Sequence, residues 1–151
     1  MPVSYRQLTA GDHDLFAAMN ALFADVFEEP DTYAGAIPRR TYVEALLADP
    51  HFIAIAAVDD NDLVGALAGY VLPKFEQERS EAYLYDLAVA RDRRRQGIAT
   101  GLIGSLKNLA RDKGCYVIFV QADQGDMPAI RLYESLGVRE DVLHFDIPVA
   151  D

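Results

Sequence analysis

Residues 86–100 read Asp-Leu-Ala-Val-Ala-Arg-Asp-Arg-Arg-Arg-Gln-Gly-Ile-Ala-Thr, and this stretch decides the expected fold. Its apolar start predicts a buried strand that ends in an arginine-rich turn. Gly97 then opens a segment, 97–113, whose apolar residues recur every three or four positions, as on one face of a helix. The start of a helix exposes about four unpaired N–H groups and the positive end of the helix dipole. A glycine there lets an anion approach the backbone, so the stretch predicts a phosphate or pyrophosphate site.

Two common phosphate-binding patterns do not fit this turn. The residues around Gly97 form neither Gly-x-x-x-x-Gly-Lys-Ser/Thr nor Gly-x-Gly-x-x-Gly. Arg94 and Arg95 would add positive charge to the backbone amides. The alternative is that these arginines form an ordinary solvated surface and that the glycine serves only close packing.

Composition limits the class of protein. The 151 residues, 51% hydrophobic and 25% charged, fit one soluble domain, residues 1–151. A net charge of −10 argues against a nucleic-acid partner and favours a cationic ligand. A single cysteine, Cys115, and three histidines far apart in the chain predict neither a disulfide nor a metal site. Since there is no long apolar run and no signal-like start, we expect no membrane span and a cytoplasmic location.

The periodicity of the chain predicts a fold of the α/β (α+β) class. Strands that form hairpins are followed by alternating helices and strands, which is typical of a mixed sheet. Asp12 is the expected N-cap of the first helix, and that helix is expected to stop in the turn-forming residues 28–31. We expect strands at 3–8, 51–58, 63–72, 81–90, 116–122 and 142–147, and helices at 15–26, 38–47, 97–113 and 128–136.

The signature Arg94-x-x-Gly97-x-Ala99, together with this order of elements, resembles the Gcn5-related N-acetyltransferase (GNAT) superfamily. Within it, residues 65–77, 80–89, 94–100, 116–123 and 144–146 resemble the aminoglycoside (gentamicin) 3-N-acetyltransferases. The resemblance implies a mostly antiparallel central sheet with helices on both faces and a splayed acetyl-CoA cleft. It implies acetyl transfer from acetyl-CoA to the 3-amino group of a cationic aminoglycoside, which gives antibiotic resistance. It also implies a homodimer.

The resemblance indicates which residues bind acetyl-CoA. The backbone after Asp86 would lie along the pantetheine arm, and the loop amides would hold the pyrophosphate. Asp126 stands where the superfamily often has an asparagine, so its contact with pantetheine departs from the pattern. The expected cofactor contacts are Leu87, Ala88, Val89, Arg94, Arg95, Gln96, Gly97, Ile98, Ala99, Thr100, Asp126 and Ala129.

Asp86 is the residue we expect to act as the base or to bind the amine. Strict alternation along the strand places it on one face with Ala82, Leu84 and Ala88, which are all apolar. A carboxylate on such a face is costly unless it is paired or functional. The alternative is a structural aspartate that caps the arginine-rich turn or pairs with an arginine.

Tyr133 is the expected proton donor. It lies in Ala129-x-x-x-Tyr133-x-x-x-Gly137, which resembles the superfamily segment whose tyrosine protonates the departing thiolate. The alternative is a tyrosine that only packs in the core. Residues expected to face the cationic acceptor are Glu81, Tyr83, Asp123, Asp126 and Asp146.

Two other functions remain open at this point. A polyamine or another small amine could be the acceptor for the same fold. Alternatively, the chain could be an acyl-CoA-binding sensor that does not catalyse transfer.

Overall fold

The computed structural model describes residues 2–150, which fall into two compact units. One unit runs up to Gln121, and the other runs from Ala122 onward. The first unit contains the whole sheet and four of the helices described below. The single-domain assignment for residues 1–151 stays a prediction.

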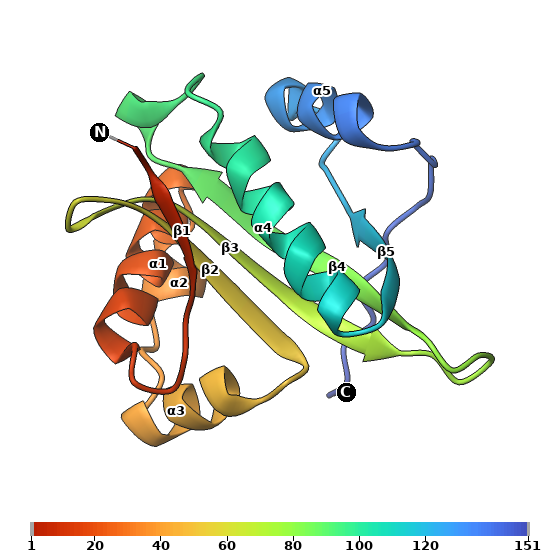
Figure 1. Ribbon diagram of the computed structural model, residues 1–151, viewed down its shortest axis with the longest axis horizontal. Coiled ribbons are helices and arrows are strands. Elements are labelled where there is room, and N and C mark those ends of the chain that lie inside the picture. The colour runs from red at the N-terminus through yellow and green to blue at the C-terminus, as the bar shows by residue number, and fades with distance from the viewer. Residues whose placement is uncertain (1, 151) are drawn as a thin grey trace. The chain divides into compact units, whose positions relative to one another are not determined.

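The first unit is built on a five-stranded sheet in the order β1-β2-β3-β4-β5 (Figure 1). All neighbouring strands are antiparallel except β4 and β5, which are parallel. This topology confirms the expected mixed α/β class and the predicted hairpin of β2 with β3. The strands are β1 Ser4–Gln7, β2 Phe52–Asp59, β3 Asp62–Pro73, β4 Ser80–Val89 and β5 Cys115–Val120.

Helices cover both faces of this sheet. Helices α1 (His13–Val26) and α3 (Arg40–Ala48) pack on one face, where Phe23 and Val43 join a buried cluster with alanines of β2, β3 and β4. Helix α4 (Ile98–Asp112) crosses the other face (Figure 1). Gly65 of β3 permits this crossing, because a Cβ there would lie 2.9 Å from Ile98 Cγ2.

The connection between α1 and α3 differs from the expected turn. A five-residue helix, α2 (Pro30–Ala34), follows α1, and Pro30 stands in its first turn. Proline fits that position because its fixed φ suits a helix and its missing N–H is not needed there. So short a helix shows no periodicity in the sequence, so the pattern could not reveal it. Helix α3 begins at Arg40 rather than Pro38, since Arg39 is extended with ψ of 152°.

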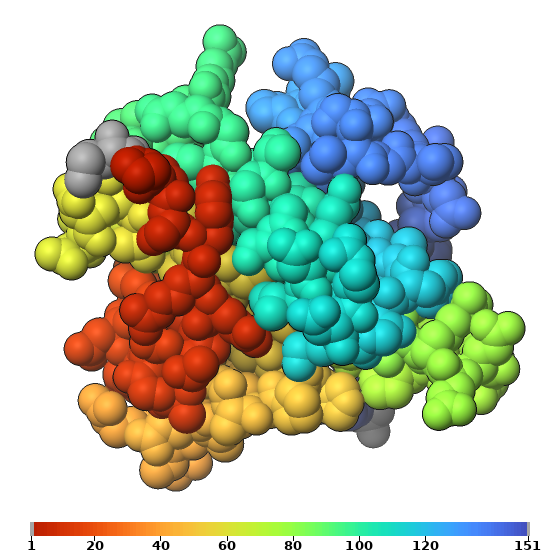
Figure 2. Space-filling view, viewed as in Figure 1, coloured from red at the N-terminus to blue at the C-terminus, as the bar shows by residue number. Residues whose placement is uncertain are grey.

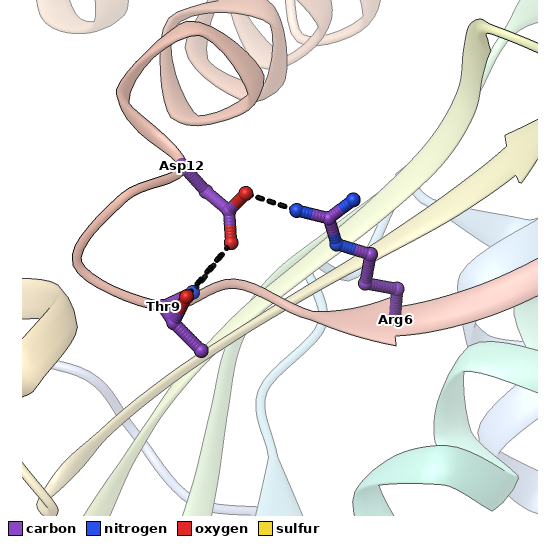
Figure 3. Close-up of polar contacts among 3 residues, drawn as sticks. All are labelled: Arg6, Thr9 and Asp12. Atoms are coloured by element: carbon purple, nitrogen blue, oxygen red, sulfur yellow. Dashed lines mark hydrogen bonds and ion pairs between the residues drawn. The ribbon is translucent and has the colours of Figure 1, made fainter.

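The residue before α1 is the expected Asp12, but its carboxylate does not cap the helix amides. Asp12 Oδ2 instead accepts the Thr9 N–H at 2.7 Å, and Oδ1 accepts a bond from the Arg6 guanidinium (Figure 3). Asp12 therefore ties the end of β1 to the start of α1.

The second unit contains one helix, α5 (Met127–Leu136), and a long extended segment. The expected strand at 142–147 is wrong: within the described chain, this segment has no strand assignment and no partner strand. A strand needs a neighbour to take its backbone hydrogen bonds, and apolar alternation alone does not supply one. The side chains of Leu143, Phe145 and Ile147 are exposed.

Candidate active site

The acceptor side of the candidate site begins with an irregularity in β4. Leu84 pairs with Gly69 and Asp86 pairs with Ala68, so Tyr85 is an extra residue opposite β3. This β-bulge is compatible with β3 because Gly69 has no side chain: a Cβ there would lie 2.6 Å from the Tyr83 carbonyl oxygen. A bulge changes which face the following residues point to.

The bulge corrects the expected environment of Asp86. Strict alternation placed Asp86 with Ala82 and Leu84, but β4 is not strictly alternating. Ala68, the partner of Asp86, packs against the cluster that α1 and α3 cover, and Ala88 belongs to that cluster. Asp86 therefore faces α1, on the opposite side of the sheet from Leu84.

A cavity of about 190 Å³ opens beside Asp86 on this face. Its walls come from all three N-terminal helices and from β2, β3 and β4, and they are mainly aromatic or aliphatic. Sequence reasoning found Asp86 but not the surrounding wall, because the wall comes from segments far apart in the chain. The lining residues are Phe16, Met19, Asn20, Phe23, Tyr33, Leu46, Phe52, Ala68, Tyr70, Tyr85 and Asp86.

Asp86 is half-buried and accepts one hydrogen bond from Tyr33. The Tyr33 hydroxyl donates to Asp86 Oδ2 at 2.8 Å. Burial raises the pKa of Asp86, the Tyr33 hydrogen bond lowers it in part, and the nearby Glu29 charge raises it again. No arginine among residues 2–150 pairs with Asp86, so the structure does not support the alternative of an arginine-paired carboxylate.

Aromatic rings form a row from this cavity across the sheet. Tyr85 meets Tyr70 edge-on at a centroid distance of 5.6 Å, and it meets Tyr83 at 5.4 Å. Tyr83 stacks on Phe119 at 4.4 Å, and its hydroxyl donates to Gln121 Oε1 at 2.7 Å. The predicted acceptor residue Tyr83 therefore lies on the same face as Asp86.

On the donor side, β4 and β5 separate. The parallel pairing runs from Ser80 with Cys115 to Leu84 with Val120, and β4 continues to Val89. In the described part of the chain, the edge of Leu87, Ala88 and Val89 that faces away from β3 has no strand partner. This open edge lies where the sequence predicted backbone contacts with the pantetheine arm.

Beyond β4, the arginine-rich turn leads into α4. A 3-10 turn at Arg91–Arg93 is followed by two residues with left-handed backbone, Arg95 (φ 62°) and Gly97 (φ 78°). A Cβ on Gly97 would meet no atom within 4 Å, so the space above it is open. Among residues 2–150, the N–H groups of residues 97–100 find no protein acceptor. Figure 2 shows this green segment projecting from the surface of its unit.

The four arginines of the turn divide into two pairs. Arg91 contacts Asp25 and Glu28 at the end of α1. Arg93 lies 2.7 Å from Asp59 Oδ2, and its Nε donates to Gln96 Oε1. These contacts fix the turn to the rest of the unit. Arg94 and Arg95 are exposed and have no charged partner within the described residues, so their charges are available at the open helix start.

Glu81 lies near the start of β4, five residues before Asp86. It accepts hydrogen bonds from the Tyr116 hydroxyl at 2.9 Å and from Lys74 Nζ at 3.3 Å. These two bonds, that of Tyr116 first, lower the pKa of Glu81. Glu81 is thus already paired, and the structure does not bring it to the cavity that Asp86 lines.

The remaining predicted residues lie in the second unit. Asp126 caps α5 by accepting the Ala129 N–H at 3.3 Å, so the carboxylate that replaces the expected asparagine has a structural partner. The Asp123 carbonyl accepts the Asp126 N–H, and Asp146 lies 2.8 Å from His144 Nε2. Tyr133 is half-buried in α5. The roles assigned to these residues stay predictions.

The described residues also limit other kinds of site. No group of three or more His, Cys, Asp or Glu side chains in residues 2–150 is arranged to hold a metal ion. No helix in this range has the length and apolar character needed to cross a lipid bilayer.

A mixed sheet whose fourth and fifth strands separate beside an open helix start has the architecture of an N-acetyltransferase. Residues 16–138 match the model of the acetyltransferase (GNAT) family, and the chain belongs to that family. Members of this family use acetyl-CoA.

Solved structures of two aminoglycoside acetyltransferases from uncultured soil samples are similar to this chain. One is 52% identical with a TM-score of 0.97, and the match covers 99% of this chain and 100% of that chain. The other, in complex with sisomicin, is 33% identical with a TM-score of 0.90 and coverage of 97% and 96%.

Curated relatives are more distant. An N-alpha-acetyltransferase of Saccharolobus solfataricus is 30% identical over an alignment of 95 residues, with coverage of 56% of this chain and 54% of the relative. The chain therefore spans about half the length of the curated relatives it matches.

Proposed function

We propose that this protein transfers an acetyl group from acetyl-CoA to the 3-amino group of aminoglycosides of the gentamicin class, in the cytoplasm. The observation that carries the proposal is the arrangement along β4. Asp86 lies in this strand beside an aromatic cavity, and the three residues after it form an open edge that leads to an open helix start. The 52% identity to an aminoglycoside acetyltransferase, in a match that covers 100% of that chain, supports the substrate class.

The donor side fits acetyl-CoA in its chemistry. The unpaired N–H groups of residues 97–100 and the cations Arg94 and Arg95 would hold a diphosphate. The free edge of Leu87, Ala88 and Val89 would hydrogen-bond the pantetheine amides as a neighbouring strand does. Acetyl-CoA, when bound, supplies an acetyl thioester to the amine.

The acceptor side must provide a neutral amine. An amine of pKa about 8 costs roughly 1.4 kcal/mol to deprotonate at pH 7, whereas one of pKa about 10.4 costs roughly 4.6 kcal/mol. Amines crowded by other cations on one sugar lie near the lower figure, so a modest base suffices. Asp86 takes the amine proton, directly or through one water, while Tyr133 of the second unit supplies a proton to the departing sulfur.

Charge and aromatic surface suit a polycationic sugar. The protein carries a net charge of −10, which attracts cations. The rings of Tyr83 and Tyr85 offer flat contacts next to Asp86. Asp123 and Asp146 are the additional carboxylates that we propose for the acceptor.

We also propose that the protein is a homodimer. In the extended segment after α5, Leu143, Phe145, Ile147 and Val149 alternate and are all exposed, which is the pattern of a strand without its partner. A second copy would provide a partner and cover the apolar side chains. Sedimentation of the full chain tests this: a dimer is expected, and a monomer at micromolar concentration contradicts it.

The function is tested by following CoA release with four acceptors: gentamicin, sisomicin, spermidine and a lysine peptide. We expect release with the two aminoglycosides, and mass spectrometry of the product should place the acetyl group on the 3-amino nitrogen. Release with spermidine alone would indicate a polyamine acetyltransferase. Acetyl-CoA binding without release for any acceptor would indicate a sensor. Acetylation at another nitrogen would refute the 3-amino assignment.

A further inference from the structure

Tyr33 lies on α2, the short helix that the sequence did not reveal, and its ring is held firmly. It packs against Phe23 at a centroid distance of 5.6 Å and against Phe27 at 5.7 Å. Both phenylalanines belong to α1 or its end, and Phe23 is 1% exposed. The ring of Tyr33 therefore has a fixed position, which also fixes its hydroxyl.

The hydroxyl reaches across the cavity to β4. It donates to Asp86 Oδ2 at 2.8 Å, between residues 53 positions apart in the chain. Burial, followed by the hydrogen bond to Asp86, raises the pKa of Tyr33. Tyr33 consequently remains protonated at working pH and can donate to the carboxylate but cannot take a proton from an amine.

We propose that Tyr33 is a positioning residue for Asp86, which holds Oδ2 with its hydroxyl and leaves Oδ1 as the oxygen that receives the acceptor's proton. This inference rests on the proposed function, in which Asp86 deprotonates the amine. The proton moves from the ammonium nitrogen to Oδ1, the nitrogen lone pair becomes available for attack, and Tyr33 keeps its own proton. The hydrogen bond also favours the ionised carboxylate in a cavity whose burial disfavours it.

Few charged or titratable groups compete with Tyr33 for control of Asp86. From the loop before α2, Glu29 raises the pKa of Asp86 by charge repulsion. From β3 and β4, the tyrosines 70, 83 and 85 face the same region, and burial raises the pKa of Tyr70 and of Tyr83, so these two stay neutral at working pH. The residues that α1 and α3 contribute to the cavity wall carry no titratable side chain. Tyr33 and Glu29 thus act on Asp86 with opposite signs.

The test compares Tyr33→Phe with Glu29→Gln. Tyr33→Phe keeps the ring that packs against Phe23 and Phe27, so folding should be preserved, and a melting curve checks this. We expect kcat/KM for gentamicin at pH 7 to fall by about tenfold, the size expected for one hydrogen bond to a charged group. The acidic limb of the pH profile should move to higher pH in Tyr33→Phe and slightly to lower pH in Glu29→Gln. KM for acetyl-CoA should not change in either variant.

A titration of the Asp86 carboxyl carbon by NMR in the free protein separates this inference from the proposed function. We expect its pKa to rise in Tyr33→Phe, to fall in Glu29→Gln, and to stay in place in Tyr70→Phe, which removes a neighbouring hydroxyl that does not bond to Asp86. An unchanged titration in Tyr33→Phe, or an equal loss of activity at every pH, overturns the inference. If the titration moves but the kinetic profile does not, the inference is also overturned, because Asp86 is then not the group that the reaction titrates. Absence of acetyl transfer in the wild type would instead refute the proposed function, while the titration still tests the contact of Tyr33 with Asp86.

Discussion

The donor side and the acceptor side of the candidate site differ in the groups that form them, backbone on one side and side chains on the other. The donor side consists mainly of backbone, namely the open edge of residues 87–89 and the amides of residues 97–100, with the charges of Arg94 and Arg95 beside them. The acceptor side consists of side chains that α1, α2, α3 and three strands bring together around Asp86. The comparison teaches that the donor side depends on backbone conformation and tolerates many side chains, whereas the acceptor side depends on individual functional groups.

The largest effect should come from Asp86, the one carboxylate in the cavity wall. We expect Asp86→Asn to lower kcat by about 100-fold or more, the usual contribution of a positioned base, while acetyl-CoA affinity stays within about twofold. Steady-state kinetics and calorimetric titration of acetyl-CoA measure the two quantities. Equal, small losses in kcat and in acetyl-CoA affinity would mean that Asp86 does not act on the acceptor side alone.

The same substitution should make the protein more stable at neutral pH. Burial raises the pKa of Asp86, so the folded protein binds that proton more tightly than the unfolded chain does. Stability is therefore lost as pH rises from the ordinary carboxyl pKa through the raised one. Because asparagine carries no charge, Asp86→Asn should have a higher Tm at pH 7 and a flatter Tm over that interval, as measured by calorimetry.

Tyr133→Phe should have the next largest effect if the second unit supplies the proton for the departing sulfur. We expect kcat to fall by about tenfold with little change in either KM, since a thiolate leaves readily and a proton donor aids it only in part. Rapid-mixing kinetics over a pH series measure this change. An unchanged kcat would leave Tyr133 with a packing role only.

Gly97→Ala should affect the donor side alone. Alanine is strained in the left-handed region by about 1–2 kcal/mol, and its methyl group would enter the open space above the turn. We expect acetyl-CoA binding to weaken by about fivefold, with kcat at saturating acetyl-CoA nearly unchanged. Gly104→Ala is the matched control, because that glycine lies inside α4 with open space around it. It should stabilise the protein by about 0.5–1 kcal/mol without changing the affinity.

The smallest effect should be that of salt. Acceptor binding to an acidic protein is weakened when salt screens charge, so raising ionic strength from about 0.01 to 0.15 M should raise KM for gentamicin by roughly twofold to threefold. KM for acetyl-CoA should change less, since in the proposed function backbone hydrogen bonds hold it and only Arg94 and Arg95 act on it by charge. An acceptor KM that does not respond to salt would show that the acidic surface does not guide binding.

The sequence predicted the conformation of the donor side, a strand followed by a turn and a helix start, because that information is local, while the cofactor contacts stay predictions. Arg94, Gly97 and the helix that follows are adjacent in the chain, and a left-handed glycine at a helix start has a recognisable pattern. The sequence did not reveal the intramolecular partners of Glu81 and Asp126, and the ligand contacts expected of these two residues stay predictions.

The acceptor side was predicted only in part. Asp86 could be singled out as a carboxylate in an apolar strand. The face of the sheet on which it lies could not be predicted, because both faces of this strand are apolar or aromatic and the bulge therefore does not show in the sequence pattern. Tyr33 could not be predicted as its partner, since 53 residues separate them and α2 is too short to show a pattern. The apolar pattern of residues 142–147 predicted a strand, but no pairing partner is present in the described chain.

The extra residue in β4 has a consequence for engineering. Deleting Tyr85 would remove the bulge but leave Leu84 paired with Gly69 and Asp86 paired with Ala68, so Asp86 would stay on the side of Tyr33 and the cavity. Flattening the bulge with Tyr85 retained would instead pair Asp86 with Leu67 and turn the carboxylate to the side that α4 covers, although no residue is lost. Alignments of relatives in this strand, with or without a gap, should accordingly be inspected for the side on which the carboxylate emerges, before its function is transferred.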